Sequence, residues 1–284
     1  MRVNRSHLLL LTRQSRLHHS LAGDFGRRDH GRWTWMVQQC GADSNLDIIL
    51  MDPDAVLAAR AEVIKSTDCS TIGRVAGYVI KTWVSHGAGD WLKDCVRGPR
   101  AERAGLKALE LLDAGIPTAE PLAWGCGRGW DSRARSVLVM KELTGAVDLG
   151  QWKGDRLQMS GRFGHLIGVL HQKGFTHRDL KPTNLLLTPD GSPYLIDLDG
   201  LRRPGSVSRH RAVADLVKLA RRMVELSTLS PKEAARFVAG YASERDGLSR
   251  RAWWRDLKAE AFRHREFHSR EWESSKFEIR NPKF

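Results

Sequence analysis

The chain of 284 residues is 41% hydrophobic and 28% charged, the composition of a soluble globular protein with room for one large domain or two lobes. Its 46 Lys and Arg residues against 33 Asp and Glu leave a net charge of +13, which favours anionic partners such as nucleotide phosphates, nucleic acid or an acidic membrane surface, although a solvated basic surface would look the same. Four scattered cysteines without a C-x-x-C pair indicate neither a zinc site nor a disulfide framework. The aliphatic run at residues 8–11 is too short for a membrane span or a secretory signal, so we expect a cytoplasmic chain.

The first half of the chain has the pattern of a small sheet. Residues 1–30 are rich in Arg, His and Ser without a sustained hydrophobic period, which predicts a basic flexible tail. Beyond it, short apolar runs predict strands at residues 33–37, 47–51, 63–64, 73–75, 78–83, 122–124 and 136–140. A short helix is expected at residues 55–61, and a longer one from Pro99 to Ala114 with an apolar stripe of Leu106, Leu109 and Leu112. Residues 31–141 therefore predict an N-terminal lobe, a mostly antiparallel sheet with one helix.

The second half of the chain is mostly helical. Its helices are predicted at residues 163–173, 213–226, 231–241 and 250–273. The helix at 231–241 has the clearest start, because Ser230 is a natural N-cap and Pro231 fits the first helical position. Two short strands, 185–187 and 194–196, flank a turn at residues 189–191. Residues 142–284 therefore predict a C-terminal lobe, and the fold class is α+β.

Between these helices lies the segment His177-Arg-Asp-Leu-Lys-Pro-Thr-Asn184, whose residue types suit phosphoryl transfer. That reaction needs a carboxylate to orient the attacking hydroxyl, oxygen ligands for Mg²⁺ and a cation for the nucleotide phosphates. Asp179, Asn184 and Asp197 follow one another at the spacing of the base, the metal-binding amide and the metal-binding carboxylate of a kinase. We therefore predict a phosphotransferase that uses ATP and Mg²⁺, with Asp179 as catalytic base and Asn184 and Asp197 as metal ligands.

Two carboxylates compete for the second metal position, because the run Ile196-Asp-Leu-Asp-Gly200 contains both Asp197 and Asp199. The spacing from Asn184 and the hydrophobic residues before Asp197 favour Asp197. Asp199 is then either an accessory carboxylate or a turn former.

The nucleotide-binding lysine is predicted at Lys81, which ends a Val-Ile-Lys pattern on the strand 78–83. In kinases a lysine at this place contacts the α- and β-phosphates of the nucleotide and pairs with a glutamate on the following helix. The expected partner is Glu102, near the start of that helix, with Glu110 as the alternative.

The remaining nucleotide contacts are less specific. Residues 66–73 are not a G-x-G-x-x-G loop; their hydroxyls and amides could line the phosphates, but a plain hairpin loop fits nearly as well. The strand 136–140 and the residues after it are predicted as the hinge between the lobes. The backbone around Met140 and Glu142 would then hydrogen-bond the adenine.

These residues as a set resemble the bacterial lipopolysaccharide core kinases, the Kdo and heptose kinase group also called the InaA-type family. The resemblance covers about residues 45–245 and is carried by residues 78–81, 114–122, 177–184 and 194–199. It implies a bilobal protein-kinase-like fold. It also implies transfer of the γ-phosphate of ATP to a sugar hydroxyl, of Kdo or heptose, in the lipid-linked inner core. The reaction would take place at the cytoplasmic face of the inner membrane, where the chain would be a peripheral protein.

The surroundings of the motif favour such an acceptor. About fifteen residues separate Asp197 from the next helix without an A-P-E motif, whereas a protein kinase needs a longer segment to dock a peptide. This short segment carries the basic residues Arg202, Arg203, Arg209 and Arg211, which suit a phosphorylated or carboxylated glycolipid. Asp215 falls where these folds often place a buried aspartate that holds the catalytic loop, and an ordinary helix residue is the alternative. Lys181, in contrast, is typical of Ser/Thr protein kinases, in which it stabilises the transferred phosphoryl group.

Two other functions remain open. One is a Ser/Thr protein kinase; the other is a basic pseudokinase-type protein that binds nucleic acid, which the presence of Lys81, Asp179, Asn184 and Asp197 does not favour. The C-terminal stretch of alternating aromatic and basic residues either rests against anionic lipid or packs on the C-terminal lobe. Its members are Trp253, Trp254, Arg255, Phe262 and Arg263.

Overall fold

A computed structural model describes residues 24–39, 43–85, 87, 89, 94, 96–128, 134–225, 230–245 and 249–263. The chain divides into two compact units, one of Met1–Ala146 with Tyr194–Asp199 and one of Val147–Pro193 with Gly200–Phe284. The first unit therefore takes in Tyr194–Asp199, which the sequence places in the C-terminal lobe. This exchange puts Asp197 in the same unit as Lys81.

The first unit is built on a seven-stranded sheet in the order β1-β2-β6-β7-β5-β4-β3. All neighbouring strands run antiparallel. The strands are β1 (Phe25–His30), β2 (Trp33–Gln38), β3 (Glu62–Thr67), β4 (Ser70–Val75), β5 (Tyr78–Val84), β6 (Pro121–Arg128) and β7 (Ala134–Lys141). The predicted antiparallel sheet is confirmed.

Strand β1 corrects the predicted tail, because it lies within residues 1–30. It pairs with β2 from Phe25 opposite Gln38 to His30 opposite Trp33, and Gly31 turns the hairpin with a φ of 55°. Phe25 also packs on Trp124, with ring centroids 4.5 Å apart. Tertiary contacts therefore stabilise this strand, although its polar sequence does not predict one. Residues 1–23 of the predicted tail lie outside the described residues.

The predicted strand at residues 47–51 is wrong, since this segment is helix α3 (Ser44–Met51). Asp43 caps the helix by accepting the N–H of Leu46 at 2.9 Å, and Leu46, Ile49 and Leu50 bury one helical face. Helix α4 (Pro53–Ala59) follows from its own cap at Asp52, near the predicted short helix. The first unit thus has more helices than predicted.

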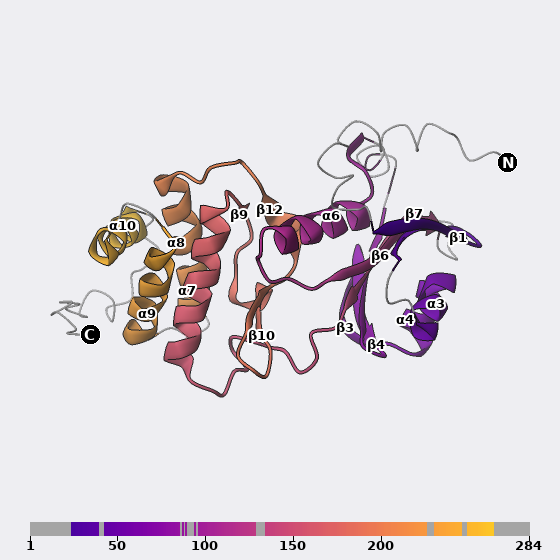
Figure 1. Ribbon diagram of the computed structural model, residues 1–284, viewed down its shortest axis with the longest axis horizontal. Coiled ribbons are helices and arrows are strands. Elements are labelled where there is room, and N and C mark those ends of the chain that lie inside the picture. Colours follow the sequence, from indigo (N-terminus) through magenta and orange to yellow (C-terminus); the bar gives the residue numbers. More distant parts are fainter. Residues whose placement is uncertain are drawn as a thin grey trace. The chain divides into compact units, whose positions relative to one another are not determined.

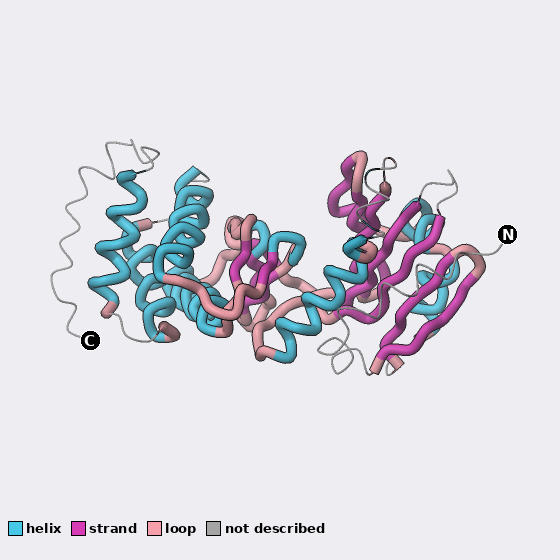
Figure 2. The backbone as a smooth tube through the Cα atoms, turned by 90° about the horizontal axis from the view of Figure 1, so that it is seen from above, coloured by secondary structure: helices cyan, strands magenta, loops and turns pink. Residues whose placement is uncertain are grey.

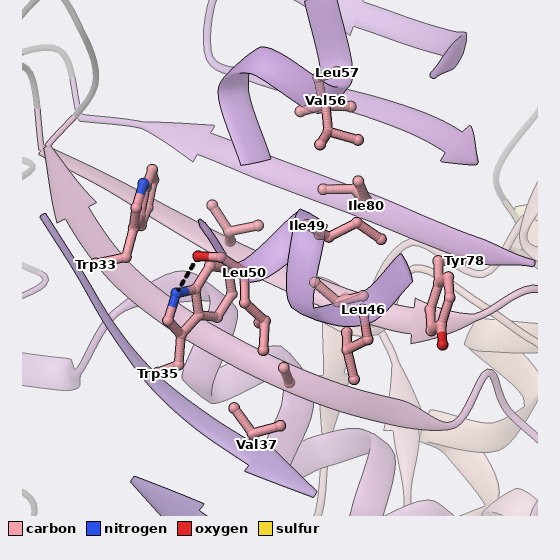
Figure 3. Close-up of a cluster of buried hydrophobic side chains, with 13 residues drawn as sticks. Trp33, Trp35, Val37, Leu46, Ile49, Leu50, Val56, Leu57, Tyr78 and Ile80 are labelled. Atoms are coloured by element: carbon pink, nitrogen blue, oxygen red, sulfur yellow. Dashed lines mark hydrogen bonds between the residues drawn. The ribbon is translucent and has the colours of Figure 1, made fainter. Parts of the chain in front are cut away.

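Helices cover both faces of this sheet. Helices α3 and α4 lie against one face and α6 (Arg100–Asp113) against the other (Figure 1). Figure 3 shows the α3 side, where Trp33, Trp35 and Val37 alternate inward along β2. The indole N–H of Trp35 donates to the carbonyl of Leu50 at 3.0 Å, which ties the helix to the sheet.

Helix α6 approaches the opposite face mainly through small residues, and Leu106 and Leu109 of the predicted leucine stripe pack, partly buried, against the same cluster. Ala101, Ala104, Gly105, Ala108 and Leu111 are its buried residues, whereas Leu112 is exposed. A Cβ at Gly105 would lie 2.7 Å from the ring of Trp124. Side chains of this size let the helix axis come close to the tryptophan, which fixes the position of α6 on the sheet.

The second unit consists mainly of helices, which appear as neighbouring cyan tubes in Figure 2. They are α7 (Arg156–Gln172), α8 (Arg209–Glu225), α9 (Pro231–Ser243) and α10 (Arg250–Arg263). The predicted start of α9 is confirmed, because Ser230 and Glu233 form a capping box. Helix α7 begins earlier than predicted, because Asp155 caps it. None of the helices in the described part of the chain is both long and apolar enough to cross a membrane.

Short elements connect these helices. They are β8 (Val147–Asp148), β9 (Thr176–His177), η1 (Pro182–Asn184), β10 (Leu185–Leu187), β11 (Pro193–Leu195), η2 (Leu198–Gly200) and β12 (Leu201–Arg202). Strand β10 pairs with β8, and β12 pairs with β9. The predicted helical second half with two short strands is confirmed.

Helices α7 and α9 meet at glycines, and this contact gives a first testable prediction. A Cβ at Gly164 would fall on the backbone carbonyl of Phe237, and one at Gly240 on that of Gly161. We expect Gly164→Ala to destabilise the protein by about 2–3 kcal/mol, because backbone cannot move aside as a side chain can. Thermal unfolding would show a lower midpoint. Gly87→Ala is the matched control, since an added Cβ there meets nothing within 4 Å, and equal midpoints for both variants would contradict the prediction.

Candidate active site

Lys81 lies on β5 and points to the α6 side of the sheet. Its Nζ is 2.8 Å from Oδ1 of Asp197 and 3.7 Å from Oδ2 of Asp199, and it lies 4.8 Å above the ring of Trp83. Only 13% of the lysine side chain is exposed. The sequence predicted both Lys81 and Asp197, and the structure brings them together within the first unit.

The carboxylates beside Lys81 in this structure are not the predicted one. Within the described residues Lys81 forms no ion pair with Glu102 or Glu110, because the carboxylates of Asp197 and Asp199 take its ammonium group. Glu102 lies in the first turn of α6, where burial raises the pKa of its carboxyl.

Asp197 has a backbone conformation that is rare for a residue other than glycine. Its φ is 59°, in the left-handed region. Such a conformation costs on the order of 1 kcal/mol and persists where surrounding contacts impose it, as is common at functional sites. The side chain of Asp197 is 36% exposed and that of Asp199 is 52% exposed. A cation can therefore reach the carboxylate oxygens of both residues.

The catalytic-loop residues lie in the second unit, after β9. The N–H of Arg178 donates to the carbonyl of Gly200 at 3.0 Å, which fixes the start of the loop. Nζ of Lys181 contacts the Asp179 carboxylate at 2.5 Å, and 58% of the Asp179 side chain is exposed. The Asp179 carboxylate is therefore held by a cation and still open to solvent.

Asn184 ends the loop and is almost fully buried. Its amide nitrogen donates to the backbone carbonyl of Asp179 at 3.0 Å. The amide oxygen is then the atom left for a cation. Amide and carboxylate oxygens are the protein ligands that Mg²⁺ prefers, so Asn184 and Asp197 fit this metal by their chemistry. No cluster of three His, Cys, Asp or Glu side chains suited to another metal occurs in the ranges that the structure describes.

The predicted hinge residues use most of their backbone groups inside the protein. The N–H of Lys141 donates to the carbonyl of Glu120, and the N–H of Glu142 to that of Gly77, both at 2.9 Å. Met140 is a paired residue of β7. Among the described residues, the N–H of Leu143 has no such partner. Leu143, which follows Glu142 in the predicted hinge, therefore has its N–H available.

The segment 66–73 is a hairpin, the plainer of its two predicted forms. Strands β3 and β4 continue almost to its tip, and their hydroxyls bond one another. The hydroxyls of Ser66 and Thr71 are 3.2 Å apart, and so are those of Thr67 and Ser70. Hydroxyls satisfied in this way are weak candidates for phosphate ligands.

Asp215 is fully buried on α8, and its contacts are with α7 and α8. Its carboxylate lies 3.3 Å from Nε of Arg211 and 3.9 Å from Nε2 of His171. No hydrogen bond joins it to the catalytic loop in the described part of the chain. Nδ1 of His171 hydrogen-bonds the hydroxyl of Tyr241 at 2.8 Å, so three helices share one buried polar cluster.

This cluster gives a prediction on the pH dependence of stability. Burial, with Arg245 and Arg211 nearby, lowers the pKa of His171 from 6.5 to about 3. The unfolded chain then binds the proton more readily, so stability should fall by about 1.4 kcal/mol for each pH unit below about 6. Burial raises the pKa of Asp215, which acts in the opposite sense. We expect unfolding midpoints between pH 7.5 and 5.5 to drop less in His171→Gln than in the unaltered protein, and parallel curves would contradict this.

The basic segment after Asp197 is largely engaged within the second unit. Arg209 pairs with Asp256 of α10, Arg211 pairs with Asp215, and Arg203 lies 5.0 Å above the ring of Phe175. Arg202 is exposed, and the described residues provide no partner for its guanidinium. Of the four predicted acceptor-binding arginines, Arg202 is therefore the one with its charge available.

The aromatic C-terminal stretch packs on its own unit. Trp253 is 1% exposed and meets Tyr241 edge-on, with centroids 4.9 Å apart, and Trp254 is 9% exposed. The packed helix is thus the correct alternative for these two residues, because buried indoles cannot enter lipid. Phe262 and Arg263 are in α10, but their side chains lie outside the described residues.

Comparison with known proteins agrees with this geometry. The model of the lipopolysaccharide kinase (Kdo/WaaP) family matches residues 67–241. The 3-deoxy-D-manno-octulosonic acid kinase of Xylella fastidiosa strain M12 is 33% identical over 116 residues, 38% of this chain. The match covers 45% of that relative, less than half of its length. Human serine/threonine-protein kinase 16 is 53% identical over 35 residues, 12% of each chain.

A solved structure described as WaaP in complex with acyl carrier protein shares the fold. It superposes with a TM-score of 0.53 at 23% identity, over 76% of this chain and 93% of that one. The predicted α+β, protein-kinase-like fold is confirmed by this likeness. Since the family match spans more than half of the sequence and includes Lys81, the catalytic loop and Asp197, the chain belongs to the lipopolysaccharide kinase (Kdo/WaaP) family.

Proposed function

We propose that the chain is a kinase that transfers the γ-phosphate of ATP to a sugar hydroxyl, of Kdo or heptose, in the inner core of lipopolysaccharide. The observation that carries this proposal is the complete set of phosphoryl-transfer groups in a member of this family. Lys81 lies beside Asp197, and Asn184 braces the backbone of Asp179 with its amide nitrogen. A protein that only binds nucleic acid has no need of these groups in such an arrangement.

The role of each residue follows from its contacts. Asp179 orients the sugar hydroxyl and accepts its proton, because its carboxylate is exposed beside Lys181. Lys181 stabilises the negative charge of the phosphoryl group in transfer. Lys81 binds the nucleotide phosphates, and the backbone from Met140 to Leu143 holds the adenine, with the N–H of Leu143 as donor. Glu142 lies 3.9 Å from Arg74 and supports that segment.

Mg²⁺ would be held by the amide oxygen of Asn184 and the carboxylate of Asp197. When bound, it neutralises charge on the β- and γ-phosphates. Glu102 does not reach Lys81 in this structure, and we propose for it only that its carboxylate becomes available to the lysine when Asp197 takes a metal.

The acceptor side is proposed from charge. Arg202 is suited to a phosphate or carboxylate on the core oligosaccharide, because its guanidinium offers a forked pair of donors. We expect Arg202→Gln to raise the KM for the acceptor about tenfold, as loss of a charged hydrogen bond would, with the KM for ATP unchanged. Arg209→Gln is the matched control, since Arg209 already pairs with Asp256. Equal acceptor KM values for both variants would remove Arg202 from the acceptor site.

The place of action follows from the substrate. A lipid-linked acceptor lies at the inner face of the inner membrane, so we propose peripheral association there, with the net charge of +13 attracting anionic lipid. The buried indoles of Trp253 and Trp254 do not contribute to it.

The test is a transfer assay with labelled ATP, Mg²⁺ and a panel of core glycolipids, beside an Asp179→Ala control. Label on a sugar with the intact protein alone supports the proposal. Label on protein alone, with no effect of glycolipid, would show a protein kinase. Absence of turnover together with salt-sensitive nucleic-acid binding would show a binding protein.

A further inference from the structure

A lysine outside the kinase motif contacts the metal-binding segment. Nζ of Lys107, on α6, donates to the backbone carbonyls of Leu198 and Asp199, at 3.0 Å each. Both carbonyls belong to η2, the single turn that follows Asp197 directly. All of these residues lie in the first unit.

The contact bears on Asp197 because the left-handed backbone of this residue must be held from outside. On its N-terminal side, the N–H of Leu195 donates to the carbonyl of Pro117 at 3.0 Å. On its C-terminal side, the two bonds from Lys107 hold the peptide groups that follow Leu198 and Asp199. These contacts on both sides oppose relaxation of Asp197 to an ordinary φ, and its carboxylate lies 2.8 Å from Nζ of Lys81.

The two bonds from Lys107 to η2, here called the anchor, differ from the ion pair between Lys81 and Asp197 in one respect. In the proposed reaction Lys81 turns to the nucleotide phosphates and Asp197 to Mg²⁺, so that ion pair is exchanged during binding. The bonds from Lys107 to η2 end on backbone carbonyl oxygens and not on the carboxylates of this segment, and they therefore persist when the ions rearrange. Charge-assisted bonds of this kind are about twice as strong as neutral ones.

The base of the anchor is itself fixed. Lys107 lies half-buried between Ala104 and Ala108, the small residues by which α6 sits against the sheet. Because Gly105 contacts Trp124 so closely, α6 cannot slide without a steric clash. The helix thus supplies a rigid point from which Lys107 reaches η2.

We propose that Lys107 is a positioning residue, which holds Asp197 in its metal-binding conformation by anchoring η2 to α6. This inference rests on the proposed function, and it adds that α6 is coupled to the metal site through Lys107. Its consequence is a specific one: loss of the ammonium group should weaken Mg²⁺ binding more than it weakens the fold or metal-free nucleotide binding.

The experiment measures binding of a fluorescent ATP analogue to the full chain while Mg²⁺ is titrated, with a metal-free sample in EDTA. Lys107→Met keeps the aliphatic stem and removes the charge. We expect it to raise the Mg²⁺ concentration for half-maximal binding about tenfold, the effect of losing charged hydrogen bonds. Lys107→Arg, which retains donors, should recover most of that loss, and Lys232→Met, at an exposed lysine of α9, should behave as the unaltered protein.

The outcomes separate the inference from the function beneath it. An unaltered protein without any Mg²⁺-dependent nucleotide binding would overturn the proposed function and the inference together. Normal binding with the same Mg²⁺ dependence in Lys107→Met would overturn the inference alone. Equal weakening in Mg²⁺ and in EDTA would show a merely structural role and overturn it too. Should Lys107→Met fail to fold, Lys107→Gln is titrated instead and is held to the same tenfold expectation.

Discussion

Replacing Asp179 by alanine should lower the rate of phosphoryl transfer by about 10²–10⁴-fold, the usual contribution of a general base. Binding of Mg²⁺ and nucleotide should stay nearly unchanged. The carboxylate is 58% exposed and its partner is Lys181, so its removal leaves no buried charge alone. Asn184 bonds the backbone carbonyl of Asp179, which alanine retains, so the metal-binding amide keeps its orientation. The effect should therefore appear in kcat and not in nucleotide affinity.

The control for this variant is Asp113→Asn, which neutralises an exposed carboxylate at the end of α6. Single-turnover rates with saturating nucleotide, measured beside nucleotide binding, distinguish chemistry from binding. If Asp179→Ala loses nucleotide affinity in proportion to its rate, Asp179 organises the loop and is not the base. If it keeps its rate, another group takes the proton, and the role assigned to the motif is wrong.

The catalytic loop was predictable because its geometry is local. Asp179, Lys181 and Asn184 lie within six residues, and their contacts are set by one turn of backbone and one 3-10 turn. The same holds for α9, whose start depends on a capping box of neighbouring residues. The order and spacing of residues along the chain are enough to predict contacts between such close neighbours.

Contacts between distant segments were not predictable in this way. The segment 47–51 has the apolar residues of a strand, but the cap at Asp43 and the packing of Leu46, Ile49 and Leu50 on β2 make it a helix. Strand β1 is polar in sequence and is ordered by pairing with β2 and by Phe25 against Trp124. Tertiary burial outweighs local propensity in each case.

The partner of Lys81 shows the same limit at the site. Sequence spacing pointed to Glu102, because a glutamate on the next helix is expected there. The structure instead places Asp197, 116 residues away in the chain, at 2.8 Å. Asp197 has a left-handed backbone and the turn after it is bonded by Lys107, and neither feature leaves a signal in a single sequence.

The choice between Asp197 and Asp199, left open by the sequence, leads to the second large effect. Asp197→Asn should lower turnover by at least about 10²-fold, because a metal that neutralises phosphate charge contributes several kcal/mol to the transition state. Asp199→Asn is the matched control, with an expected loss of about tenfold or less, since a charged contact at the rim contributes far less. We expect the larger loss for Asp197→Asn because Asp197 lies closer to Nζ of Lys81, at 2.8 Å, than Asp199 does, at 3.7 Å.

A double-mutant cycle then tests whether Lys81 and Asp197 act as one unit. Lys81→Met should also cost at least about 10²-fold, and the double variant should be little worse than either single one, because groups that serve the same bound phosphates are strongly non-additive. Steady-state rates over a range of Mg²⁺ concentrations provide the measurement. Additive losses would mean that the 2.8 Å ion pair belongs to the nucleotide-free protein alone. Non-additive losses, with Asp199→Asn independent of Lys81→Met, would assign the metal to Asp197, because only a ligand on the same phosphates loses its function when the lysine is gone.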